Sequence, residues 1–308
     1  MDQGDSLIKT ILVTGFLGAG KTTVINRLID DYLGKADKLA VMINEFGSIG
    51  IDGALVPDGD FYKIELNKGS IFCVCMRTDF IAELKSIAEK IAPDILLIEA
   101  TGIARVDDMY AMMRLDGLDK LLTIEKNICV IDAAGFHKVE ATLEAVRIQA
   151  EYADAFILNK VDLASEQRLE ETIRLLRKYN QKAPILPAEY GETESDALEK
   201  TAGLEKKVPE SCSDSPPEDF FSFSVELENP LDRDKWLHFI NDIKHRTLRG
   251  KGVLQFTEGP VFFEIINGEY TENKTSPGLN GNSNSKIVLI RNNMLEEELA
   301  KRIKDCTI

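Results

Sequence analysis

The chain has 308 residues, of which 44% are hydrophobic and 29% charged, a composition typical of a folded globular protein. Its formal net charge of −15 disfavours nonspecific binding to nucleic acid or to an anionic membrane. No apolar run approaches the roughly 20 residues of a membrane span. The acidic first residues do not resemble a signal peptide, and five cysteines do not suggest a disulfide scaffold. We therefore expect a reduced, cytoplasmic protein.

The first distinctive pattern is Gly-Phe-Leu-Gly-Ala-Gly-Lys-Thr at residues 15–22, which fits the phosphate-binding loop G-x-x-x-x-G-K-[ST]. An apolar strand is expected at 10–14 and an amphipathic helix at 21–32, so that phosphates would meet a helix N-terminus. Lys21 would contact the β- and γ-phosphates, and the Thr22 hydroxyl would bind Mg²⁺. The residues expected to hold the nucleotide here are Gly15, Gly18, Ala19, Gly20, Lys21, Thr22 and Thr23.

Short apolar runs then alternate with helical patterns. Buried strands separated by helices are typical of a parallel sheet with helices on both faces, which predicts the α/β fold of a P-loop NTPase. The expected strands are 39–43, 61–66, 95–98, 128–131 and 155–158, and the expected helices are 79–91, 138–152 and 165–179.

The strand at 95–98 is followed by Glu99, with Gly102 three positions later. An acid at the end of such a strand can hold the hydration shell of Mg²⁺ through a water molecule. The N–H of a glycine at this distance can sense the γ-phosphate and move when it is hydrolysed. We expect Glu99 and Gly102 to form this second nucleotide element.

Asn159-Lys160-Val161-Asp162 follows the strand at 155–158. A carboxylate can accept two hydrogen bonds from the N1–H and N2–H₂ edge of guanine, a donor pair that adenine lacks. Asp162 would read this edge, Asn159 would contact the base and brace the phosphate loop, and the stem of Lys160 would lie over the ring. The pattern therefore predicts GTP and GDP as ligands.

An acidic, Pro-rich segment at 209–219 is expected to link a nucleotide-binding domain at 1–208 to a second domain at 220–308. The second domain is predicted to be small and α+β. Residues 271–285, rich in Asn, Gly and Ser, are expected to form a mobile loop. The expected strands are 220–227, 251–257, 260–267 and 286–291, and the expected helices are 234–246 and 294–304.

Taken together, the chain resembles the CobW-type GTPases over nearly its whole length. These belong to a group that includes the nickel chaperones for hydrogenase and urease. The resemblance implies a Mg²⁺-dependent GTPase that loads, releases or positions a transition metal or metal cofactor for a client metalloprotein, such as a corrinoid enzyme. It is carried by residues 15–23, Asn44-Glu-Phe-Gly47, Gly50-Ile-Asp52, Cys73-Val-Cys75, Glu99-Ala-Thr-Gly102, Asn159-Lys-Val-Asp162 and, in the second domain, Arg249-Gly-Lys-Gly252.

In this family the Asn-Glu-Phe-Gly region lies in the first switch. The resemblance therefore implies that Glu45 or Asp52 contacts Mg²⁺ or orients the attacking water, and the sequence leaves the choice between them open. The expected catalytic set is Lys21, Glu45, Asp52 and Glu99. A homodimer remains an open alternative to a monomer.

The family usually has Cys-x-Cys-Cys where this chain has Cys73-Val74-Cys75-Met76, and its thiolates are proposed metal ligands. Cys73 and Cys75 could chelate one Zn²⁺ or Co²⁺, with His137 as an outside ligand. Alternatively, the two cysteines pack as small buried side chains and His137 is simply exposed. Ile43 and Ser48 also replace glutamates of many members.

Two other functions stay open, the first of them because of this altered cysteine motif. The chain could be a nucleotide-switched binding module for a client protein that has lost metal binding. It could also be a small-molecule kinase, although such an enzyme would normally lack the guanine-reading element.

Overall fold

The computed structural model describes residues 7–44, 61–66, 74–140, 143–193, 197–198, 201, 203–206, 208–209, 220–266, 268–274, 284–292 and 296–308. Among these, the residues up to 209 form one compact unit and those from 220 form another. The predicted domain boundaries stay predictions, because residues 210–219 lie outside the described part. No helix within that part is both long enough and apolar enough to cross a bilayer.

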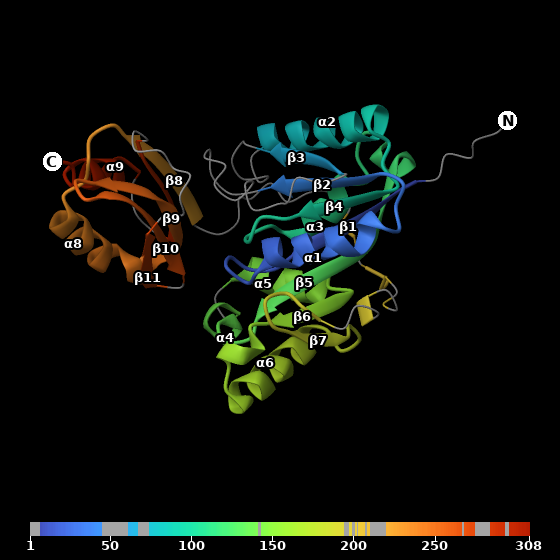
Figure 1. Ribbon diagram of the computed structural model, residues 1–308. Helices are drawn as coiled ribbons and strands as arrows, with labels where there is room; N and C mark the ends of the chain where they lie inside the picture. Colours follow the sequence, from blue (N-terminus) through green and yellow to red (C-terminus); the bar gives the residue numbers. More distant parts are fainter. Residues whose placement is uncertain are drawn as a thin grey trace. The chain divides into compact units, whose positions relative to one another are not determined.

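The first unit is built on a seven-stranded sheet in the order β3-β2-β4-β1-β5-β6-β7 (Figure 1). Every ladder in it is parallel, which confirms the predicted sheet type. From β1 the chain crosses to β2 on one side, whereas from β4, which lies beside β1, it crosses to β5 on the other side. The loop after β1 therefore lies at the switch point where α/β sheets bind ligands. The strands are β1 (Ile8–Thr14), β2 (Leu39–Asn44), β3 (Tyr62–Leu66), β4 (Ile95–Glu99), β5 (Leu122–Asp132), β6 (Ala155–Asn159) and β7 (Ile185–Ala188).

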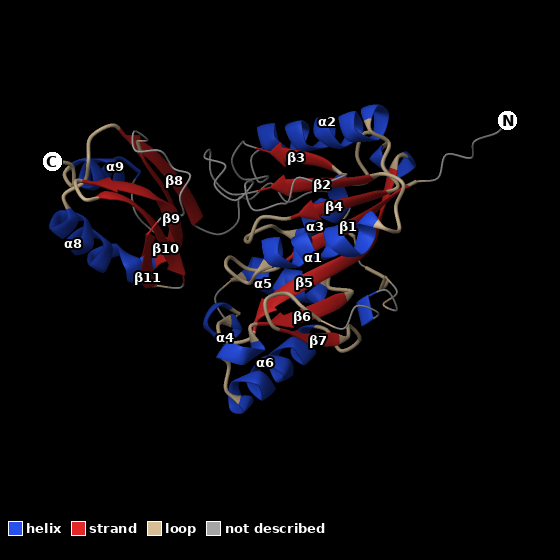
Figure 2. Ribbon diagram, in the orientation of Figure 1, coloured by secondary structure: helices blue, strands red, loops and turns tan. Residues whose placement is uncertain are grey.

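Helices cover both faces of this sheet (Figure 2). Alternate residues of β1 enter two different apolar clusters, with Leu12 in one and Ile11 and Val13 in the other. This explains why the strands are apolar runs rather than alternating patterns. The helices are α1 (Lys21–Leu33), α2 (Val74–Lys90), α3 (Val106–Met112), α4 (Phe136–Val139), α5 (Glu144–Glu151) and α6 (Glu166–Tyr179), and the short 3₁₀ turns include η3 (Val161–Leu163).

Three sequence predictions for this unit need correction. The helix expected at 79–91 begins five residues earlier, because α2 spans Val74–Lys90. The single helix expected at 138–152 is wrong: α4 and α5 are separate, because Leu143 before α5 is extended and buries its side chain. β5 begins six residues before the expected start at 128, since Lys126 and Asn127 are buried polar residues inside it. An apolar run cannot reveal such positions.

The second unit is a five-stranded antiparallel sheet in the order β11-β10-β9-β12-β8, and the predicted α+β class is confirmed. Trp236 is fully buried between this sheet and its helices, with its ring edge-on to Phe263 at 5.3 Å between centroids. The elements are β8 (Phe220–Leu227), α8 (Arg233–Ile243), η4 (Lys244–Arg246), β9 (Thr247–Phe256), β10 (Gly259–Ile266), β11 (Glu269–Lys274), β12 (Ser285–Asn292) and α9 (Glu296–Lys304).

The predicted range of the loop at 271–285 is too long at both ends. Residues 271–274 belong to β11, and Ser285 begins β12. β11 was missed because it is an edge strand made almost wholly of polar residues, so hydrophobicity gives it no signal. Residues 275–283 of the expected loop lie outside the described part.

Candidate nucleotide-binding site

The loop between β1 and α1 is shaped by glycine. Gly15 has φ +131°, and a Cβ there would lie 2.1 Å from the Val130 carbonyl oxygen, so no other residue fits without a backbone shift. Gly20 caps α1 in the left-handed conformation. The 13-residue helix has no side-chain cap and no acidic residue in its first turn. Its first N–H groups can therefore serve an anion.

The two side chains predicted to act on phosphate and metal begin this helix. Lys21 is 6% exposed, and its Nζ donates to the Phe16 carbonyl within the loop at 3.3 Å. The Thr22 hydroxyl donates to Glu99 Oε1 at 2.9 Å. Because β4 pairs with β1, Glu99 lies opposite Val13 at the carboxyl end of the sheet. A hydroxyl and a buried carboxylate side by side are the hard oxygen donors that Mg²⁺ prefers, so these residues fit the ion.

The segment after Glu99 packs closely on the phosphate loop. A Cβ on Gly102 would lie 2.6 Å from the Leu17 backbone nitrogen, so only glycine allows this approach. From α5, the buried Gln149 donates to the carbonyl oxygens of Gly102 at 3.4 Å and Ala104 at 3.0 Å. The Gly102 backbone is thereby held beside the phosphate loop.

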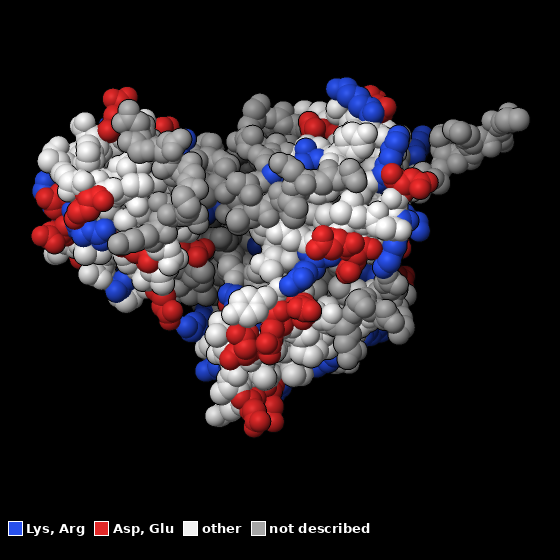
Figure 3. Space-filling view, viewed as in Figure 1, with Lys and Arg blue, Asp and Glu red and all other residues white. Residues whose placement is uncertain are grey.

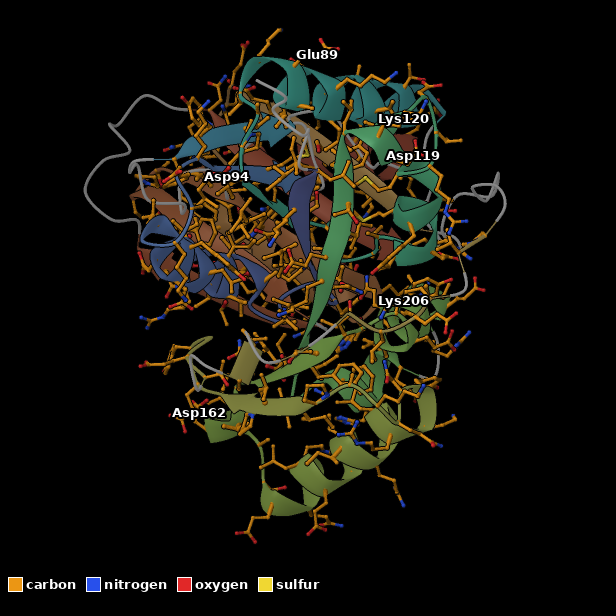
Figure 4. The ribbon with its side chains drawn as sticks, turned by 90° about the vertical axis from the view of Figure 1, so that its right-hand side faces the viewer. Glu89, Asp94, Asp119, Lys120, Asp162 and Lys206 are labelled. Atoms are coloured by element: carbon orange, nitrogen blue, oxygen red, sulfur yellow. The ribbon has the colours of Figure 1, made fainter. Side chains whose placement is uncertain are left out.

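Asn159 and Lys160 both bind the phosphate loop from the end of β6. Asn159 Nδ2 donates to the Ala19 carbonyl at 2.9 Å, and Lys160 Nζ donates to the Gly18 carbonyl at 2.6 Å. Lys160 has the left-handed backbone φ of 62°, which turns the chain at this point. Asp162 follows in η3 and is exposed, where its carboxylate is open to a ligand (Figure 4). The structure thus brings the predicted guanine element and the predicted phosphate loop together.

Comparison with known proteins agrees with this geometry. Residues 9–187 match the family model for the CobW/HypB/UreG nucleotide-binding domain, and residues 220–307 match that for the cobalamin synthesis protein cobW C-terminal domain. The chain belongs to the CobW/HypB/UreG family. The resemblance inferred from its motifs is confirmed, and the chain is a GTPase of a metallochaperone family.

Individual relatives have low sequence identity to this chain, although some of them match nearly all of it. The zinc chaperone YjiA of Escherichia coli (strain K12) is 27% identical, over 95% of this chain and 96% of its own. The zinc-regulated GTPase metalloprotein activator 1 of Schizosaccharomyces pombe is 30% identical over 60% of this chain and 46% of its own. The solved structure of Zn(II)-bound YjiA GTPase from E. coli is 24% identical, with a TM-score of 0.49, covering 98% of this chain and all of that one.

Sequence reasoning missed two residues of this CobW/HypB/UreG site. Asp132, at the end of β5, pairs with Lys160 at 2.8 Å and accepts backbone hydrogen bonds from Ala134 and Gly135. The available signal was an acid ending an apolar run, as at Glu99. The second residue is Gly191, whose backbone N–H donates to Asn159 Oδ1 at 2.9 Å. The sequence analysis did not predict β7, the strand that precedes this glycine, and so it did not find Gly191.

The predicted transition-metal ligands are not brought together within the described residues. Cys73 lies outside that part, and of Cys75 only the backbone, in the first turn of α2, lies within it. Glu45 and Asp52, the candidates for contacting Mg²⁺ or orienting the attacking water, also lie outside it. His137 lies on α4, which follows β5, whereas α2 follows β3. Three strands separate β3 from β5, which places their ends on the order of 19 Å apart. These ligand assignments stay predictions.

Three further observations bear on metal binding. His137 Nδ1 is buried without a partner among the described residues, and burial, followed by the charge of Arg168, lowers the pKa of this imidazole. The described residues contain no group of three His, Cys, Asp or Glu side chains that could hold an ion. Burial raises the pKa of the Cys129 thiol to about 12, so Cys129 belongs to the core rather than to a metal site.

Proposed function

We propose that this protein is a Mg²⁺-dependent GTPase that couples hydrolysis of GTP to GDP and phosphate to the delivery of a transition metal to a client metalloprotein. The observation that carries the proposal is that Glu99 accepts a hydrogen bond from Thr22, at the end of the phosphate-loop motif, while Asn159 and Lys160 bind carbonyl oxygens of the same loop. That arrangement connects a phosphate end and a base end in one site. The protein is proposed to act in the cytoplasm, with a corrinoid enzyme as one class of client.

At the phosphate end, the loop amides and Lys21 would surround the terminal phosphoryl groups. Thr22 would hold Mg²⁺ directly and Glu99 through a water molecule, and the ion would neutralise charge that develops on the phosphates. The Gly102 backbone N–H would face the γ-phosphate and move after hydrolysis. Glu45 and Asp52 remain the candidates for orienting the attacking water. Catalysis is mainly positioning and charge neutralisation.

At the base end, the exposed carboxylate of Asp162 would accept both hydrogen bonds from the guanine edge. Lys160 is suited to cover one face of the base, because its Nζ is held by Asp132 and by the Gly18 carbonyl. Asn159 would connect base recognition to the phosphate loop through Ala19.

The cargo is proposed to be zinc, since the relatives are named a zinc chaperone and a zinc-regulated activator. Cys73 and Cys75 would supply thiolates, with His137 as the predicted outside ligand. Met76 in place of a third cysteine favours the alternative, in which the chain is a nucleotide-switched binding module without metal. Zinc stoichiometry of the purified protein by mass spectrometry, with and without GTP, separates these functions. About one ion per chain supports delivery, and none supports the module.

Nucleotide choice is tested at Asp162. Asp162→Asn should weaken GTP binding and favour xanthosine triphosphate, because xanthine has a carbonyl where guanine has the amino group. Glu166→Gln, which removes an exposed neighbouring carboxylate, is the matched control. Calorimetry with Mg²⁺ measures both ligands for each variant. The GTP assignment is wrong if Asp162→Asn binds the two nucleotides in the wild-type ratio.

The phosphate end is tested separately. Lys21→Ala should lower turnover at least about 100-fold, since it removes the cation beside the reacting phosphates. Retained turnover in this variant would contradict the assignment of the loop.

A further inference from the structure

Two large apolar side chains stand out by their exposure beside the guanine element. Leu163, directly after Asp162, is 68% exposed, and Tyr190, two residues after β7, is 75% exposed. β6 and β7 are neighbours in the sheet, with Asn159 opposite Ala188 (Figure 1). Both side chains therefore leave the same end of adjacent strands. One exposed apolar residue is ordinary, but two at one site invite an explanation.

The backbone of Tyr190 gives a second, independent observation. Tyr190 and Gly191 have φ of +50° and +74°, and Glu189 and Glu192 exchange backbone hydrogen bonds across them at 2.9 and 3.3 Å. This is a two-residue hairpin turn with both central residues left-handed, where Asn, Asp or Gly normally stands first. A tyrosine there costs conformational free energy, and such a cost points to a use for the side chain.

The turn is fastened to the nucleotide site. Gly191 N donates to Asn159 Oδ1, whose own amide binds the Ala19 carbonyl of the phosphate loop. A Cβ on Gly191 would lie 3.2 Å from the Val24 backbone nitrogen, so the turn packs against the start of α1. Tyr190 is thus fixed one residue from the link between the base element and the phosphate loop.

A purine has a polar edge and two flat apolar faces. Asp162 is suited to the edge, and the stem of Lys160, held at its amino group, is suited to one face. We propose that the Tyr190 ring stacks on the other face of the guanine base. This inference rests on the proposed function, in which guanine binds at Asp162. An aromatic ring adds contact at low entropic cost and tolerates any purine, so it supplies affinity, whereas Asp162 supplies the choice of base.

The charges on the face shown in Figure 3 do not suggest a polyanionic ligand. Acidic side chains of the described residues gather in several groups there, and the basic side chains form no continuous stripe. Such a surface offers little to a polyanion. The apolar exposure at Tyr190 therefore fits a flat neutral ring better than a charged partner.

The experiment compares Tyr190→Asn with Tyr190→Phe in the full chain. Asparagine suits the left-handed position and removes the ring, whereas phenylalanine keeps the ring. The dissociation constants of GDP, IDP and inorganic pyrophosphate are measured by calorimetry with Mg²⁺. We expect Tyr190→Asn to weaken GDP and IDP by the same factor, at least about fivefold, and to leave pyrophosphate unchanged. Tyr190→Phe should stay close to the wild type.

The outcomes are distinguishable. If the wild type binds GDP and Tyr190→Asn binds it equally well, the stacking inference is wrong while the proposed function stands. The inference is also wrong if pyrophosphate weakens as much as GDP, because the change would then act on the phosphate loop. If the wild type binds pyrophosphate but not GDP, the guanine assignment fails and the inference fails with it. Thermal unfolding of both variants confirms that they are folded.

Discussion

The Thr22 hydroxyl donates a 2.9 Å hydrogen bond to Glu99, a residue 77 positions later in the chain. The bond joins the first turn of α1 to the end of β4 and places two oxygen donors where Mg²⁺ would bind a nucleotide.

Thr22→Ala should raise the Mg²⁺ concentration needed for GTP hydrolysis and lower kcat/KM by about 10- to 100-fold, because the ion loses a direct ligand. Thr22→Ser keeps the hydroxyl and should restore most of the activity. Asp31→Asn, on the exposed face of the same helix, is the control for a general effect on α1. An unchanged Mg²⁺ dependence in Thr22→Ala would contradict the metal assignment.

Asn159→Ala should both destabilise the protein and weaken nucleotide binding. The change leaves the Ala19 carbonyl and the Gly191 N–H without their hydrogen-bond partner. We expect a loss of about 2–3 kcal/mol in the free energy of unfolding. Urea unfolding measures this loss, and calorimetry measures GDP binding.

Asn180→Ala is a matched control for that change. Asn180 is also a buried amide that binds backbone groups, among them the Ala153 carbonyl and the Ala183 N–H, but none of them belongs to the phosphate loop. It should lower stability by a similar amount and leave GDP affinity intact. If both variants bind GDP equally well, Asn159 acts only on stability.

Much of the first unit could be predicted because its strands are buried on both faces. Each such strand is a short apolar run, and β4 and β6 were expected within one residue of their observed ends. The motifs place Glu99, the phosphate loop and Asn159 after predicted strands, and the observed order β4-β1-β5-β6 brings those strand ends to one edge of the sheet. The roles of these residues in nucleotide binding stay predictions.

The rest depends on tertiary contacts that leave little local signal. Lys126 and Asn127 extend β5 although they are polar, because partners elsewhere in the chain satisfy them, such as the Tyr152 carbonyl for the Asn127 amide. The pair between Asp132 and Lys160 exists only because β5 and β6 are neighbours. A sequence pattern shows neither the strand order nor these partners.

Lys206→Met should destabilise the protein without affecting nucleotide binding. Lys206 (Figure 4) forms an ion pair with Asp154 at 2.5 Å, and both side chains are buried. Asp154 also accepts hydrogen bonds from the backbone N–H of Asn127 and of Leu204. Removing the lysine leaves a buried carboxylate without its cation, which costs about 3–5 kcal/mol. Urea unfolding measures the loss of stability, and calorimetry with GDP checks that nucleotide binding is unchanged.

The exposed pair of Lys9 and Glu125, at 3.7 Å, is the control for that measurement. Lys9→Met should change the free energy of unfolding by less than about 1 kcal/mol, because solvent screens an exposed pair. Equal effects of the two substitutions would show that burial of Asp154 does not determine its contribution.

Alkylation with iodoacetamide tests the proposed zinc site within one sample. The Cys129 thiol is buried with its pKa raised to about 12, so it stays protonated at pH 8 and should react only after unfolding. Cys73 and Cys75 are expected to react in the metal-free folded protein and to be protected by Zn²⁺, since a bound thiolate is a poor nucleophile. Peptide mass spectrometry reads each cysteine separately, with Cys129 reporting on folding. Equal labelling of Cys73 and Cys75 with and without Zn²⁺, while Cys129 stays unlabelled, would exclude these thiolates as zinc ligands and favour the binding module that carries no metal.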